Sequence, residues 1–190
     1  MRRYKVGYLI GSLAKASINR KLAKALIRLA PEGLEFTEIP FGDLPLYSYD
    51  YDDDYPPVAR DFKAAIKASD AILFVTPEYN RSIPGGLKNA IDWASRPYGT
   101  NSFTHKPSAV IGTSPGAIGT AVAQQSLRSV LGFCNSPQMN APEAHITFTP
   151  GMITDDGEVT VKSTEDFLRN YMAEFHDHIE RVLTVLPNEG

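Results

Sequence analysis

Three short apolar runs, each ended by small or turn-forming residues, set the strongest limit on how this chain can fold. They are YKVGYLI (4–10), DAILFVT (70–76) and PSAVIGT (107–113). Each has the length of a β-strand and is nearly continuous in its apolar character, without strict alternation. Such runs are typical of parallel strands that helices cover on both faces. We therefore predict that these three runs are the central strands of a parallel sheet.

Segments with helical spacing separate these strands. Apolar residues recur at the three- and four-residue intervals of one helix face, most clearly at Leu22, Ala25, Leu26 and Leu29. The run GLEFTEI (33–39) alternates instead, which predicts a more exposed strand. Strands that alternate with helices along the chain predict an α/β fold, a doubly wound parallel sheet with helices on both faces. Because the apolar runs are evenly spread, residues 1–190 are expected to form a single domain.

Composition limits the partners and the compartment. The chain has 19 Lys+Arg against 22 Asp+Glu, a net charge of −3, so it lacks the basic field that nucleic-acid binding requires. The single cysteine, Cys134, cannot form an internal disulfide and belongs to no metal-ligand cluster. We expect it to be a buried apolar residue and not a nucleophile. The N-terminal apolar stretch is too short for a secretory signal and is followed by charged residues. A cytoplasmic protein without membrane insertion is expected.

In an open sheet of this kind, ligands bind beyond the carboxyl ends of the strands. The first loop there, GSLAKASINRKLA (11–23), offers the hydroxyls of Ser12 and Ser17 and the charge of Lys15 at the start of a helix. Free backbone N–H groups and the helix dipole at such a position favour an anion. The loop matches neither the P-loop nor the dinucleotide motif, so we predict a site for one phosphate. The alternative is that Ser17 only caps the helix.

The second loop lies within TPEYNRSIPGGLKNAIDWASRP (76–97). Pro77 and Pro84 are expected to stiffen it. The polar residues between them can present fixed donors and acceptors to a planar heteroaromatic ring, and Gly85 and Gly86 permit close backbone approach. In the helix that follows, Lys88 and Asp92 are spaced to pair. Trp93 falls outside that helix's apolar stripe, and we weigh an interface anchor equally against a surface or core-edge residue.

These residues carry a family resemblance. Residues 76–97 resemble the signature of the NADPH-dependent FMN reductase family, flavodoxin-like flavoproteins that include chromate and quinone reductases. Residues 11–23 resemble its phosphate loop, and TSPGAIGTA (113–121) resembles its glycine-containing loop after the fourth strand. The resemblance covers the first four strands and their loops, and more loosely the rest. It implies a flavodoxin-like fold with a five-stranded parallel sheet of order 2-1-3-4-5.

The resemblance also implies a non-covalent FMN site built from three loops, with NAD(P)H as the co-substrate. The residues implied around the phosphate are Ser12, Ala14, Lys15, Ser17, Ile18 and Asn19. Those implied at the edge of the isoalloxazine ring are Pro77, Glu78, Tyr79, Asn80 and Arg81, and those on its other side are Ser114, Pro115 and Gly116. The family usually has Arg at the position of Ala14, and Lys15 beside it offers a charge without the bidentate geometry of Arg. No catalytic acid or base is implied, because hydride transfer is the chemistry of the cofactor.

The leading hypothesis is a homo-oligomeric enzyme, a homodimer or a homotetramer. It would oxidise NAD(P)H and then reduce quinones, azo dyes, free flavin or metal oxyanions such as chromate, in a ping-pong cycle. The alternative is a flavodoxin-like FMN electron carrier without a pyridine nucleotide site. The small net charge of −3 disfavours the carrier, since docking carriers often use a strong field of one sign. A third hypothesis is a ligand-sensing or structural α/β domain that has lost its flavin, which only Ala14 suggests.

Other candidates are weaker. The histidines lack metal-ligand spacing, so no metal site is expected and all four are interpreted as residues of solvated faces: His105, His145, His176 and His178. The acidic run 52–54 is interpreted as a solvated loop, with cation binding as the alternative. The resemblance places the tyrosines around that run near the flavin of a neighbouring subunit: Tyr47, Tyr49, Tyr51 and Tyr55. An Asp-Asp-Gly turn between apolar residues at 152–160 predicts a hairpin.

Overall fold

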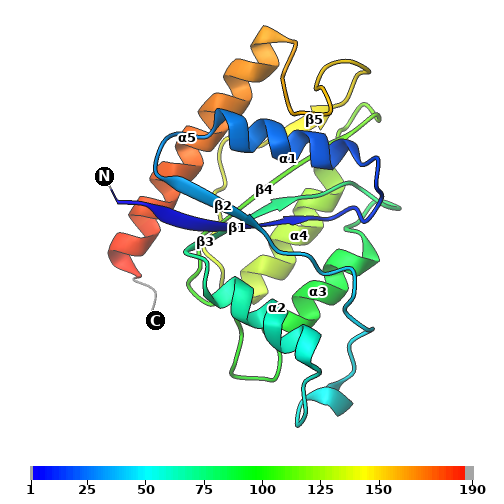
Figure 1. The fold of residues 1–190 in the computed structure, drawn as a ribbon, viewed down its shortest axis with the longest axis vertical. Coiled ribbons are helices and arrows are strands. Elements are labelled where there is room, and N and C mark those ends of the chain that lie inside the picture. The colour runs from blue at the N-terminus through cyan, green and yellow to red at the C-terminus, as the bar shows by residue number, and fades with distance from the viewer. Residues whose placement is uncertain (1, 187–190) are drawn as a thin grey trace.

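The computed structural model of this protein describes residues 2–186 and contains a five-stranded parallel sheet of order β2-β1-β3-β4-β5 (Figure 1). The strands are β1 (Tyr4–Ile10), β2 (Leu34–Glu38), β3 (Ala71–Val75), β4 (Ser108–Ser114) and β5 (His145–Thr147). The expected fold class and strand order are confirmed. Met1 and residues 187–190, which complete the expected 1–190 domain, lie outside the described residues.

Helices cover both faces of the sheet. They are α1 (Ile18–Leu29), α2 (Pro57–Lys67), α3 (Gly85–Ser95), α4 (Ala121–Phe133) and α5 (Lys162–Val185), with a short 3₁₀ helix at Tyr49–Tyr51. Figure 1 shows α1 and α5 on one face and α2, α3 and α4 on the other. Within residues 2–186, no helix is both long enough and apolar enough to cross a lipid bilayer.

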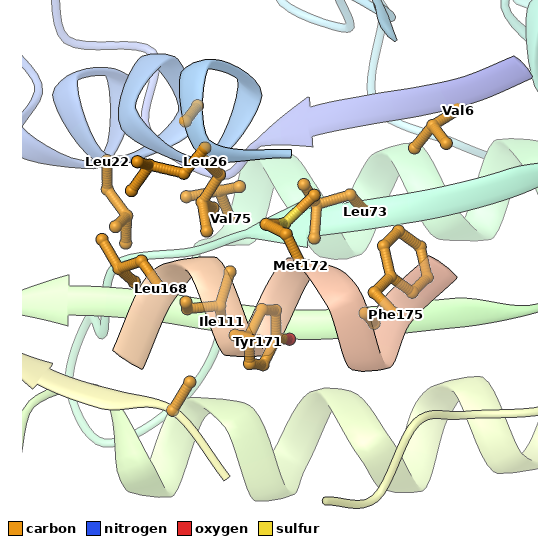
Figure 2. Close-up of a cluster of buried hydrophobic side chains, with 14 of the residues drawn as sticks. Val6, Leu22, Leu26, Leu73, Val75, Ile111, Leu168, Tyr171, Met172 and Phe175 are labelled. Carbon is orange, nitrogen blue, oxygen red and sulfur yellow. The ribbon is translucent and has the colours of Figure 1, made fainter. Parts of the chain in front are cut away.

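The core has two layers because successive residues of a strand point to opposite faces of the sheet. In β3, Leu73 and Val75 pack under α1 and α5, whereas Ile72 and Phe74 pack under α2, α3 and α4. All five residues of β3 are buried, which explains why this run has no polar alternation. Figure 2 shows the first layer, where side chains of α1 and α5 meet those of the strands. Its labelled members are Val6, Leu22, Leu26, Leu73, Val75, Ile111, Leu168, Tyr171, Met172 and Phe175.

The exposure of the remaining elements explains how well the sequence predicted them. The alternating run 33–39 forms the edge strand β2, as predicted. The last strand, β5, has only three residues and is largely exposed. The sequence therefore contains no apolar run that predicts it. The hairpin at 152–160 is confirmed as a single antiparallel bridge between Ile153 and Val159. Its glycine, Gly157, lies so close to α1 that an added Cβ would be 2.6 Å from Lys24 Cβ.

Trp93 is neither an interface anchor nor a surface residue in this chain, and the core-edge alternative is the one that the structure supports. Its side chain is fully buried, and its indole Nε1 donates a hydrogen bond to Pro45 O at 2.7 Å. Tyr47 and Tyr55 contact it edge-on, with ring centroids 5.2 and 5.0 Å away. The segment between β2 and α2 folds over the outer face of α3 and forms this small cluster. A position outside the helix's own apolar stripe is therefore buried by a distant part of the chain.

Two histidines also differ from the expectation of solvated faces. His105 and His145 are exposed, but His176 and His178 are partly buried on α5. The His176 ring packs edge-on against Tyr4, and a ring nitrogen of His178 lies 3.1 Å from Pro137 O. Both side chains lie where the long helix α5 crosses the start of the sheet, so the helix surface is covered there.

Candidate functional site

The three polar loops meet at the carboxyl edge of the sheet. Their strands β1, β3 and β4 are neighbours in register, with Ile10 opposite Val75 and Val75 opposite Ile111. Because the strands are parallel, the loops that follow them emerge at the same edge. The end of β4 and the residue after β3 run so close there that a Cβ added at Gly112 would lie 2.0 Å from Thr76 O. Glycine is therefore required at this position of β4.

A cavity of about 290 Å³ lies between these three loops. Nine of the residues expected at the cofactor line it, namely Ser12, Ser17, Ile18, Asn19, Pro77, Glu78, Tyr79, Ser114 and Pro115. Ala16 and Thr113 also line it, and the sequence analysis missed both. Ala16 carries no functional group, and Thr113 closes an apolar run, so neither gave a chemical signal. Lys15 lines a neighbouring cavity that shares Ala16, Ser17 and Ile18 with this one.

Ser17 occupies the N-cap position of α1, yet its side chain makes no capping hydrogen bond. The alternative that Ser17 serves only as a cap is therefore wrong. The backbone N–H groups of Ile18 and Asn19 have no acceptor among the described residues, as expected for the first turn of a helix. An unused hydroxyl and unpaired N–H groups thus lie at the positive end of the helix dipole. This arrangement suits an anion.

Asn19 joins the first loop region to the end of β4. Its side-chain Nδ2 donates to Thr113 O, and its Oδ1 accepts from Thr113 N, each at 3.0 Å. Asn19 is 1% exposed, so both bonds lie in the interior. The side-chain amide therefore positions the two loops, and the backbone N–H of Asn19 is the group left to bind a ligand.

The second loop is held by a tight turn as well as by its prolines. Tyr79 and Ser82 exchange two backbone hydrogen bonds of 3.0 Å around Asn80 and Arg81. Both central residues have positive φ, 51° and 63°, as a two-residue type I′ turn requires. Asn tolerates this region and Arg does so less readily, so the surrounding structure must impose it. The turn directs the half-exposed Tyr79 toward the first loop, with its hydroxyl 3.5 Å from Ser12 Oγ.

The Glu78 carboxylate binds protein groups on both sides. One oxygen accepts hydrogen bonds from the backbone N–H groups of Val122 and Ala123, at 3.1 Å each, at the start of α4. The other pairs with Arg81 at 3.3 Å. The Glu78 side chain is only 9% exposed, so its charge stabilises the N-terminus of α4 and fixes the second loop against the third.

The remaining expected residues lie at the rim. Ala14, Asn80, Arg81 and Gly116 are exposed and do not line the cavity. Ala14 shapes the first loop, because its carbonyl accepts from Ser17 N at 3.2 Å and its N–H donates to Ser12 Oγ at 3.3 Å. Gly85 and Gly86 begin α3, and no atom lies within 4 Å of a Cβ added at Gly85. Within the chain itself, Gly85 therefore makes no close backbone approach.

With this geometry in place, comparison with known proteins decides the family. The family described as NADPH-dependent FMN reductase matches residues 4–150, which include all three loops. This chain belongs to that family. The flavodoxin-like class of oxidoreductase expected from the sequence is confirmed, and FMN with NAD(P)H is the cofactor set that the family implies.

Relatives of this FMN reductase family member match its sequence over nearly its whole length. It is 48% identical over 171 residues to a 2-hydroxy-1,4-benzoquinone reductase of a Burkholderia species, covering 90% of this chain and 93% of that protein. It is 38% identical to a quinone reductase of Escherichia coli K12, covering 92% and 94%. Among solved structures, the flavoenzyme FerB from Paracoccus denitrificans, an NAD(P)H:acceptor oxidoreductase, superposes with a TM-score of 0.90 at 48% identity. That match covers 94% of this chain and 98% of FerB.

The residues present fit FMN. The unpaired N–H groups and the free Ser17 hydroxyl at α1 suit one phosphate, and Ser12 offers a second hydroxyl in the same cavity. The expected ring-edge residues Pro77, Glu78 and Tyr79 line the cavity together with Ser114 and Pro115 from the third loop. Nine of the fourteen positions that the family resemblance implies are thus brought together from three segments of the chain.

Other candidate residues lie away from this cavity. Cys134 is 3% exposed, and burial raises the pKa of its thiol, so it is buried as expected. Asp52 is not fully solvated, since it accepts a hydrogen bond from Tyr47 Oη at 2.8 Å. One grouping among residues 2–186 has metal-ligand spacing, formed by His176, Asp177 and Glu180. It lies on α5 beside the start of β1, and both of its carboxylate residues are exposed, as solvated acids commonly are.

Proposed function

We propose that this protein is an NAD(P)H-dependent flavin oxidoreductase that reduces quinones. The observation that carries the proposal is the three-loop cavity at the positive end of α1, in a chain of the FMN reductase family. Bound FMN supplies the chemistry of accepting a hydride from NAD(P)H and delivering electrons to an acceptor. The names of the Burkholderia and Escherichia coli relatives support a quinone as that acceptor.

Different residues of the chain bind different parts of the cofactor. Ser12, Ser17 and the first N–H groups of α1 hold the phosphate, with Lys15 adding positive charge beside it. Glu78 and Asn19 hold the second and third loops in place, so that the cradle for the ring is formed before a ligand binds. Backbone N–H groups of these loops would supply hydrogen-bond donors to bound FMN.

Exposed apolar side chains of the three loops favour a planar apolar acceptor. Leu13 of the first loop, Tyr79 of the second and Ile118 of the third are exposed by 61%, 48% and 44%. Val122, which follows on α4, is 37% exposed. Such a surface binds a quinone ring by burial of apolar area, whereas a small hydrated oxyanion gains nothing from it. Azo dyes and free flavin are also planar, so we expect them to be poorer acceptors than quinones and better acceptors than chromate.

Steady-state kinetics of the FMN-loaded protein tests this proposal. With NADPH or NADH varied against 1,4-benzoquinone under anaerobic conditions, parallel double-reciprocal lines are expected, because one substrate leaves before the next binds. Chromate and an azo dye serve as comparison acceptors at equal concentration. Lack of turnover with every acceptor, from protein that still binds FMN, would support the electron-carrier alternative and overturn the proposal.

The oligomeric state is proposed from the same family resemblance, as a homodimer or a homotetramer. Large exposed apolar residues lie in the segments around the buried Trp93 cluster, notably Leu46, Tyr49 and Tyr98 at 82%, 78% and 90% exposure. A contact between subunits would cover such residues. Light scattering coupled to size-exclusion chromatography measures the mass, and a monomer at micromolar concentration would contradict the proposal.

A further inference from the structure

A second cavity lies between α2 and the chain that leaves β2. Its volume is about 450 Å³, larger than that of the candidate flavin cavity, and it shares no lining residue with it. One wall is a single stripe of α2, formed by Val58, Asp61, Phe62 and Ala65. These positions follow the helical spacing i, i+3, i+4 and i+7, so they lie on one face of the helix. The opposite wall is the segment from Ile39 to Asp43.

The floor of this second cavity is apolar and firmly packed. Ile39, Phe41 and Phe62 are 2%, 5% and 4% exposed, and all three belong to the core under α2, α3 and α4. Because their other contacts are core contacts, the cavity walls are held in place without a ligand. A preformed cavity with two aromatic side chains is the usual setting for a small organic ligand.

The polar side chains that line this cavity are both acidic. Asp61 stands on the helix wall and Asp43 on the opposite wall, and both residues are exposed. In the part of the chain that the structure describes, neither carboxylate makes a hydrogen bond or an ion pair. The nearby acid Asp54, by contrast, lies 3.6 Å from Arg60. Two unneutralised negative charges therefore flank an apolar floor.

We propose that this cavity binds small organic cations, namely protonated amines or amidines that carry an aromatic or aliphatic group. The apolar part of the ligand packs on Pro40, Val58 and Ala65, the apolar lining residues that keep exposed surface, and burial of that area supplies most of the affinity. The cationic group lies between Asp43 and Asp61, which attract it and repel anions.

The cation cavity is separate from the flavin site but adjacent to it. Gly42, which lines the cation cavity, lies against Leu13 of the first loop, since a Cβ added at Gly42 would be 3.6 Å from Leu13 Cδ2. The proposal does not depend on which acceptor the flavin reduces. It is tested by binding, with the flavin site filled by FMN so that the probe cannot enter there.

Titration calorimetry with 2-phenylethylamine at pH 7 and low ionic strength is the primary test. Saturable binding of one molecule per chain is expected, and it should weaken as salt is added. The neutral analogue 2-phenylethanol should bind at least about threefold more weakly, and 3-phenylpropionate should not bind. Equal binding of the alcohol and the amine, or no saturable binding of the amine, would overturn the proposal.

Variants locate the binding to this cavity. Asp43→Asn and Asp61→Asn keep the size of an exposed side chain and should each weaken amine binding by about two- to fivefold. Neither should change the binding of 2-phenylethanol. Asp53→Asn, in the neighbouring loop, is the matched control and should bind the amine as the unaltered protein does. If both Asn variants bind the amine as tightly as this control, the cation is bound elsewhere and the proposal is wrong.

Discussion

The side chain of Asn19 and the backbone of Thr113 form two hydrogen bonds with each other, each 3.0 Å long, in the interior of the protein. The two residues are 94 positions apart in the chain. One begins the helix that follows β1, and the other lies near the end of β4. This pair therefore fixes the distance between the proposed phosphate end of the flavin site and the loop on its far side.

Replacing Asn19 by Ala should lower both stability and FMN affinity. It leaves a buried N–H and a buried carbonyl of Thr113 without partners, so the free energy of unfolding should fall by about 3 kcal/mol. FMN affinity should fall about tenfold, because the loops lose their relative position. Urea unfolding and flavin fluorescence titration measure the two effects.

Asn101 provides a matched control for Asn19. Its side-chain amide also makes two hydrogen bonds to backbone, accepting from Phe103 N at 3.0 Å and donating to Cys134 O at 2.7 Å, but away from the flavin cavity. Asn101→Ala should reduce stability without changing FMN affinity. Equal loss of FMN affinity in both variants would mean that Asn19 acts only through global stability.

Ser17→Ala should separate phosphate binding from helix capping. Because Ser17 makes no capping bond, the free energy of unfolding should change by less than about 0.5 kcal/mol. The dissociation constant for FMN should rise about tenfold through loss of a hydrogen bond to a charged group, while that for riboflavin stays the same. A stability loss of about 1 kcal/mol with equal effects on FMN and riboflavin would restore the capping explanation.

Glu78→Gln should weaken the link between the second loop and α4. The amide oxygen can still accept from Val122 N, but the negative charge at the helix N-terminus and the pair with Arg81 are lost. A fall of about 1 to 2 kcal/mol in the free energy of unfolding is expected. The exposed Glu143, which lies 3.3 Å from Gln125, is the control, and Glu143→Gln should change stability by less than about 0.5 kcal/mol. Equal changes in the two variants would contradict the role of Glu78.

His178 should make stability depend on pH in the mildly acidic range. Burial lowers the pKa of His178 below its usual 6.5, so between that value and the folded-state pKa the unfolded chain binds more protons than the folded one. Stability is therefore present above pH 6.5 and is lost as the pH falls. Urea unfolding from pH 7 to pH 5 should show a steeper loss in the parent than in His178→Gln. Parallel pH profiles would contradict the assignment.

Local sequence determined the central strands of the sheet and the loops that follow them. The runs at 4–10, 70–76 and 107–113 became β1, β3 and β4 to within one residue at each end, because strands that helices cover on both faces are mostly apolar. The loops were found for the same reason, since a glycine or proline after such a run breaks the strand and starts a turn. The exposed three-residue strand β5 left no such mark.

Contacts between distant segments decided what those side chains do. The sequence places Ser17 at a helix start in either hypothesis, and only the folded chain shows that its hydroxyl is left free while Asn19 is used to hold Thr113. It likewise cannot show that Trp93 is covered by residues more than thirty positions away, or that Glu78 binds the start of α4. Periodicity reports which face of an element is buried by its own sheet, whereas long-range packing and hydrogen bonding depend on which segments the topology brings together.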